Sequence, residues 1–134
     1  MSAQMGKGGP AHEATTSGTA TFLFTDIELS TQLARQLGGE RYRAVLERHR
    51  AVVRAFIAAY DGREIGTEGD SFFVVFGSAA NAVAAAAEAQ RALAATEWPG
   101  GATLRVRMGL HSGEATVAAA GAASDFVGYD VHKA

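Results

Sequence analysis

Two short segments near the middle of the chain, Arg63–Thr67 and the apolar Phe72–Phe76, constrain the fold more than any other feature. The residues between them, Glu68–Gly69–Asp70–Ser71, contain a Gly-Asp pair of the kind that forms tight turns. Two β-forming runs joined by so short a connection predict a β-hairpin. The fold must therefore contain an antiparallel strand pair, and the segments before and after the hairpin must pack around it.

Helical periodicity flanks the hairpin on both sides. Before it, apolar residues recur at three- and four-residue steps through Glu40–Tyr60, and Asp61–Gly62 is expected to end that helix. His49 lies on the apolar stripe of this helix and is expected to pack in the core. After the hairpin, Ser78 can cap an alanine-rich helix that runs to about Ala95.

Two more strands and a short helix complete the pattern. Thr19–Thr25 is nearly continuous in apolar residues, as in a buried central strand, and it leads into Asp26. A short helix is expected through Gln32–Leu37, stopped by Gly38–Gly39, and Thr103–His111 alternates as a half-buried strand does. The order β-α-α-β-β-α-β predicts an α+β fold with a ferredoxin-like βαββαβ core.

The two ends of the chain are expected to be less regular. Residues 1–17 are rich in glycine and small polar residues and predict a flexible tail ahead of one domain over residues 18–134. The small residues of Ala115–Ser124 are typical of a weak strand that enters a flexible loop. Phe126–Ala134 is interpreted as the start of another helix.

Composition narrows the class of protein. Apolar residues make up 48% of the 134 residues, which argues against a disordered chain, and a net charge of −2 indicates neither a nucleic-acid nor a membrane partner. The chain has no cysteine, so disulfides and thiolate sites are excluded and a reducing compartment is favoured. No apolar stretch has the length of a signal peptide core or a membrane span, so a soluble, cytoplasmic protein is expected.

Two aspartates stand at positions where they can meet. Asp26 follows the first strand and Asp70 lies in the hairpin turn, and in a ferredoxin-like sheet these two elements are neighbours. Convergent carboxylates suit Mg²⁺ or Mn²⁺ bound together with phosphates, and two such ions can assist an in-line displacement. The residues alone leave an ordinary alternative open, in which Asp26 is a strand-end cap and Asp70 is a turn former.

Four segments resemble, in order and spacing, the motifs of class III adenylate/guanylate (nucleotidyl) cyclase catalytic domains. They are Phe24–Glu28 with Ser30–Thr31, Thr67–Phe73, Arg107–Glu114 and Val127–His132, and together they cover about Gly18 to Ala134. The resemblance implies a cyclase fold without its last elements. It also implies a signal-transduction lyase that converts ATP, in preference to GTP, to 3′,5′-cyclic AMP and pyrophosphate, with two Mg²⁺ or Mn²⁺ ions and a homodimer.

The same resemblance implies roles for single positions. The metal ligands would be Asp26, Asp70 and the carbonyl of Ile27. The triphosphate would lie against backbone amides at a helix start, along Glu28, Leu29, Ser30 and Thr31. The base and ribose would be met by Asp125, His132 and the position of Gly66.

Four positions depart from the family pattern. Leu29 replaces a glycine of the phosphate loop and is expected to crowd the triphosphate or deform the loop. Gly66 replaces a base-reading lysine, and His132 replaces a ribose-binding asparagine. The transition-state arginine would fall after Ala134, which predicts weak or no activity for this chain.

Two other functions fit parts of the sequence. In one, the chain is a catalytically degenerate cyclase-homology module that senses nucleotide or dimerises, with Leu29 and Gly66 marking lost catalysis. In the other, it is a different two-metal transferase on a similar core. The match of Asp125 and Val127–Val131 to the cyclase pattern argues against the second.

Overall fold

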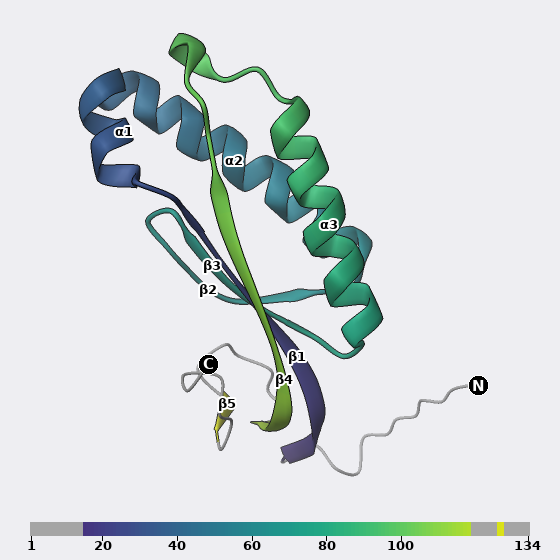
Figure 1. Ribbon diagram of the computed structural model, residues 1–134. Helices are drawn as coiled ribbons and strands as arrows, with labels where there is room; N and C mark the ends of the chain where they lie inside the picture. The colour runs from purple at the N-terminus through teal and green to yellow at the C-terminus, as the bar shows by residue number, and fades with distance from the viewer. Residues whose placement is uncertain (1–14, 119–125, 128–134) are drawn as a thin grey trace.

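The computed structural model describes residues 15–118 and 126–127, and these form one mixed sheet-and-helix layer structure (Figure 1). The elements in chain order are β1 (Thr15–Ile27), α1 (Ser30–Leu37), α2 (Gly39–Ala59), β2 (Arg63–Glu68), β3 (Ser71–Phe76), α3 (Ala79–Ala95), a 3₁₀ turn η3 (Pro99–Gly101), β4 (Val106–Ala118) and β5 (Phe126–Val127).

The sheet has the strand order β2-β3-β1-β4-β5, and every neighbouring pair is antiparallel. Strands β2, β3, β1 and β4 lie in the ferredoxin-like order that the sequence predicts. The hairpin of β2 and β3 is confirmed. Strand β1 lies in the middle, with β3 on one side and β4 on the other. This position brings the end of β1 next to both the hairpin turn and the start of β4.

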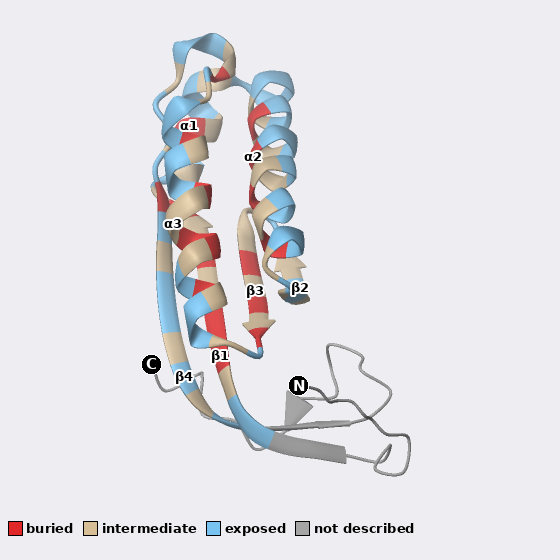
Figure 2. Ribbon diagram, turned by 90° about the vertical axis from the view of Figure 1, so that its right-hand side faces the viewer, coloured by how far each residue is buried: buried red, intermediate tan, exposed pale blue. Residues whose placement is uncertain are grey.

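The core lies between the sheet and the helices α2 and α3, which cover one face of it (Figure 1). Figure 2 shows the buried residues in helices α2 and α3 and in strands β1 and β3. Alternate residues of each strand point into this layer, as the period of a β-strand requires. The buried residues include Leu23, Ile27, Val45, Val53, Ile57, Phe72, Val74, Phe76, Ala85 and Leu93.

Helix α3 confirms the expected cap and extent. The Ser78 hydroxyl accepts a hydrogen bond from the backbone N–H of Asn81 at 3.1 Å, and the helix runs to Ala95. Ala82, Ala85 and Ala89 are buried, and their small side chains let the helix backbone approach the sheet. Of the helices that the structure describes, none is both long and apolar enough to cross a membrane.

Strands β1 and β4 are longer than the sequence predicts, although β4 begins at Val106 rather than at Thr103. β1 and β4 have 13 residues each and pair from Thr15↔Ala118 to Ile27↔Val106, because each supplies the other's backbone hydrogen bonds well beyond the apolar runs. Residues 15–17, which the sequence assigns to the tail, therefore belong to β1.

The last segment that the structure describes is a strand, where the sequence predicts a helix. The prediction of a helix from Phe126 is wrong for Phe126–Val127, which pair with β4 as a strand. These two residues have the aromatic and β-branched side chains that favour strands, and the edge of β4 offers them backbone partners. Residues 1–14, 119–125 and 128–134 lie outside the described part.

His49 occupies the core position predicted for it. The side chain is completely buried and its ring makes an edge contact with Phe72, with 5.7 Å between ring centroids. Within the described residues, neither ring nitrogen has a hydrogen-bond partner. Burial therefore lowers the pKa of His49 to about 4, despite the opposing effect of the Asp70 carboxylate.

This buried histidine predicts a pH-dependent loss of stability. The unfolded chain binds a proton at His49 near pH 6.5, whereas the folded chain does so only near pH 4. Stability from this group is thus complete above pH 6.5 and falls as pH decreases, by about 2–3 kcal/mol at pH 4.5. Urea unfolding from pH 7 to 4.5 should show this loss in the parent and a smaller one in His49→Leu. Parallel losses in the two proteins would show that another group is responsible.

Candidate functional site

The end of β1 and the hairpin turn bring Asp26 and Asp70 to one cavity. Asp70 lies in the turn between β2 and β3, and its Oδ2 accepts a hydrogen bond from the backbone N–H of Ile27 at 3.0 Å. Asp26 precedes Ile27 on β1, so this bond fixes the turn beside the Asp26 carboxylate. Both aspartates line a cavity of about 670 Å³, together with Ile27, Leu29, Ser30, Thr31, Gln32, Arg35, Ser71 and Arg107.

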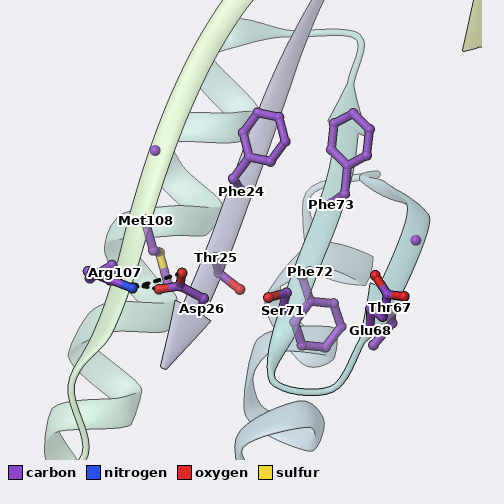
Figure 3. Close-up of a pocket in the computed structure, with 12 residues that line it drawn as sticks. Phe24, Thr25, Asp26, Thr67, Glu68, Ser71, Phe72, Phe73, Arg107 and Met108 are labelled. Atoms are coloured by element: carbon purple, nitrogen blue, oxygen red, sulfur yellow. Dashed lines mark hydrogen bonds and ion pairs between the residues drawn. The ribbon is translucent and has the colours of Figure 1, made fainter. Parts of the chain in front are cut away.

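One of these two carboxylates forms an ion pair with an arginine. Arg107 on β4 lies directly across from Asp26 in the β1–β4 register, and its Nε and Nη2 donate to the two carboxylate oxygens at 2.8 and 3.0 Å (Figure 3). The sequence places Arg107 in a family motif but predicts no role for it. The alternation of Thr103–His111 shows which face Arg107 occupies. The partner depends on the strand register, which the sequence does not reveal.

The donor set fits a divalent metal that is shared with a phosphate ligand. Asp26 and Asp70 supply hard, anionic oxygen atoms, and the backbone at Ile27 lies beside them in the same cavity. Across the described residues, three or more histidine, cysteine or acidic side chains never gather closely enough to enclose a metal. Mg²⁺ is usually held by one or two carboxylates while water and phosphate complete its shell, so two carboxylates suffice. A metal at Asp26 would compete with Arg107 for the carboxylate oxygens.

Leu29 adopts the left-handed backbone conformation that glycine normally takes. Its φ and ψ are 55° and 41°, and it precedes α1 without giving that helix a side-chain cap. The side chain is 67% exposed, so it points largely into water. The loop therefore keeps a conformation that glycine favours, and the cost of the leucine remains as backbone strain.

The backbone amides near the start of α1 differ in whether the fold already uses them. The N–H of Ile27 is bonded to Asp70, and the N–H of Glu28 donates to the carbonyl of Arg105 at 2.8 Å. The first N–H groups of an α-helix have no acceptor within the helix, so the available donors lie at the start of α1, at Ser30 and Thr31. Glu28 lines a separate cavity of about 330 Å³ with Leu29, Gln32, Leu33, Gln36, Thr103 and Arg105.

A third cavity, of about 620 Å³, opens on the sheet face away from the helices. Phe24 and Phe73 form part of its wall and stack at 4.7 Å with nearly parallel rings (Figure 3). Asp26 and Arg107 line both this cavity and the 670 Å³ cavity that contains Asp70, so the two cavities are adjacent. Gly66 also lines the cavity at Phe24 and Phe73, and a methyl group there would meet open space. The other predicted base and ribose contacts, Asp125 and His132, lie outside the described residues.

Comparison with known proteins identifies relatives of this chain. Residues 12–133 match the family described as the adenylate and guanylate cyclase catalytic domain. The adenylate cyclase of Lachancea kluyveri is 35% identical over 83 residues, which are 62% of this chain and 4% of that protein. A receptor-type adenylate cyclase of Trypanosoma congolense is 41% identical over 78 residues, 58% of this chain and 10% of that protein. The chain thus spans a tenth or less of these curated relatives.

Solved structures show the same architecture. An adenylate cyclase from Trypanosoma brucei in its monomeric state superposes with a TM-score of 0.66 at 26% identity, over 71% of this chain and 56% of that one. The monomeric guanylyl cyclase domain of the RhoGC fusion protein from the aquatic fungus Blastocladiella emersonii gives a TM-score of 0.76 over 90% of this chain and 75% of that one. Its 21% identity supports the fold alone.

The conformation of Leu29 predicts that glycine is better tolerated there than alanine. Leu29→Gly removes the left-handed strain and should stabilise the chain by about 0.5–1 kcal/mol, because the relief exceeds the added chain entropy. Leu29→Ala keeps a Cβ in the same conformation and should give no gain. Urea denaturation of both variants checks this, and equal stability of the two variants would contradict it.

Proposed function

The chain belongs to the family of adenylate and guanylate cyclase catalytic domains, and on this premise we propose that it converts ATP to 3′,5′-cyclic AMP and pyrophosphate. The observation that carries the proposal is the meeting of Asp26 and Asp70 at one cavity, with the start of α1 and Arg107 beside them. This arrangement brings anionic oxygens for metal ions next to cationic and N–H groups for phosphates.

The reaction forms one phosphorus–oxygen bond and breaks another. The ribose 3′-hydroxyl loses its proton and its oxygen attacks the α-phosphorus, while the bond from that phosphorus to the bridging oxygen of the β-phosphate breaks. Two bound Mg²⁺ or Mn²⁺ ions would lower the pKa of that hydroxyl and stabilise the attacking and leaving oxygens. The chain's own residues contribute mainly position and charge.

Each part of the cavity has a distinct task in this proposal. Asp26 and Asp70 hold the metal ions, and the carbonyl of Ile27 is a further ligand. The amides at Ser30 and Thr31 face the phosphates, where the positive end of the helix favours negative charge. Arg107, once released from Asp26, offers a planar guanidinium that can bind two phosphate oxygens at once.

We further propose that two copies of the chain form the complete site. One copy would supply the metal-binding half, and the other would supply Asp125, His132 and the surface at Gly66 to the base and ribose. The cavity at Phe24 and Phe73 supports this arrangement, because it is continuous with the Asp26–Arg107 pair and lies on the sheet face that α2 and α3 do not cover. The preference for ATP over GTP depends on Asp125 and on the adenylate cyclases among the relatives.

A cyclase assay with matched aspartate variants tests the proposal. Cyclic nucleotide release from ATP and from GTP should be measured with Mn²⁺, in the chain and in a form extended beyond Ala134 with a relative's C-terminal segment. Asp26→Asn and Asp70→Asn should each lower activity by about 100-fold or more, because changing even outer-shell metal partners costs 10–100-fold. Asp61→Asn makes the same chemical change at an exposed position after α2 and should have no effect.

The outcomes separate the candidate functions. Product from ATP that requires Asp26 and Asp70 but not Asp61 supports the cyclase. Binding of ATP with Mn²⁺ but no product in either form favours the nucleotide-sensing module, which the strain at Leu29 and the missing side chain at Gly66 also fit. Absence of nucleotide binding in both forms contradicts both functions.

The ion pair predicts opposite effects of Arg107 on metal and on nucleotide. Arg107→Met frees Asp26 and removes a positive charge, so Mn²⁺ should bind a few-fold more tightly without nucleotide, as expected for an exposed pair. ATP should bind more weakly, because a phosphate partner is lost. Electron paramagnetic resonance of free Mn²⁺ and ATP titration measure the two affinities. Arg105→Met, just ahead of the same strand but at the smaller cavity, is the control, and an equal effect there would contradict the prediction.

A further inference from the structure

The turn that carries Asp70 is held from two sides. On the sheet side, Asp70 accepts the N–H of Ile27 at 3.0 Å. On the helix side, Nη2 of Arg50 on α2 donates to the carbonyl oxygen of Gly69 at 2.5 Å. Gly69 is exposed with a φ of 57°, and a methyl group on its Cα would meet no atom within 4 Å, so packing does little to hold this residue. The two hydrogen bonds therefore locate the turn between the sheet and α2.

The helix that presents Arg50 is itself fixed against the hairpin. His49 packs its buried ring against Phe72, two residues after Asp70. One turn further along α2, the Arg54 guanidinium lies 5.4 Å from the centre of the same Phe72 ring and pairs with Glu64 of β2 at 2.7 Å. Arg50 thus extends from a segment of α2 that cannot shift along the hairpin without breaking these contacts.

The environment of Arg50 includes a feature that lowers the stability of the fold. Its Nε is buried, and among the described residues it has no hydrogen-bond acceptor. A buried donor without an acceptor costs stability, and such costs are typically found where a side chain has another task. Arg50 and Asp70 both interact electrostatically with His49: the Asp70 carboxylate raises the pKa of His49 and the Arg50 guanidinium lowers it.

We propose that Arg50 is a positioning residue that fixes the Asp70 carboxylate for divalent metal binding. It acts through the carbonyl of Gly69, the residue before Asp70, and touches neither the metal nor the substrate. The proposal rests on the proposed function, since it assigns Asp70 as a metal ligand. Ligands that are held in place by outer-shell hydrogen bonds bind metal more tightly, because less ordering remains to be done on binding.

The first experiment reads the turn without any metal. Amide hydrogen exchange at Ile27 reports the bond to Asp70 directly, and exchange at buried Val74 in β3 reports global stability. Arg50→Met keeps the aliphatic stem but removes the donor, so it should speed exchange at Ile27 more than at Val74. Arg50→Lys restores a donor and should recover most of the protection. Arg48→Met changes an arginine of the same helix that contacts Glu97 instead, and it should match the parent.

The second experiment measures Mn²⁺ affinity by electron paramagnetic resonance of the free ion. Arg50→Met should weaken binding about 10-fold or more, as outer-shell changes do, whereas Arg48→Met should not. Equal Mn²⁺ affinity in the parent and in Arg50→Met, or unchanged Ile27 exchange, overturns the proposal. If Asp26→Asn and Asp70→Asn leave the parent's Mn²⁺ binding unchanged, the proposed function fails instead, and the Ile27 exchange still decides whether Arg50 holds the turn.

Discussion

Strand β1 is paired along both edges, with β3 from Thr21 to Thr25 and with β4 from Thr15 to Ile27. One side of the strand carries core residues such as Leu23 and Ile27, and the other carries Phe22, Phe24 and Asp26. A shift of one residue in either pairing would exchange these two sets. The hydrophobic core and the acidic site are therefore fixed by the same backbone hydrogen bonds, which explains why Asp26 can be partly exposed and still well placed.

The site joins charges from every layer of the fold. Asp26 and Asp70 come from the sheet and its turn, Arg107 comes from the neighbouring strand, and Arg50 reaches the turn from α2. Arg35 also lines the cavity, so the positive side chains around the two aspartates outnumber them. In the proposed function, metal ions would pair with Asp26 and Asp70 and the triphosphate would pair with Arg107, while Arg50 would keep its bond to the carbonyl of Gly69.

The sequence predicts local features of this protein better than contacts between distant segments. The hairpin, the helix boundaries near α2 and α3, and the approach of Asp26 to Asp70 follow from periodicity, turn residues and strand adjacency. The pairing of Arg107 with Asp26 does not, because it depends on the register of two strands whose paired residues are 81 positions apart. The helix expected at Phe126–Val127 is a strand instead, since the edge of β4 that recruits it is a tertiary feature.

The exposure of the Asp26–Arg107 pair has a consequence for how readily the site can change state. The two side chains are 39% and 64% exposed, so water and salt already screen the attraction between them. Breaking such a pair requires little work, and re-forming it after a ligand leaves yields little. The paired and unpaired arrangements of these two side chains are therefore close in free energy, so Asp26 can exchange Arg107 for another partner at little cost to the stability of the fold.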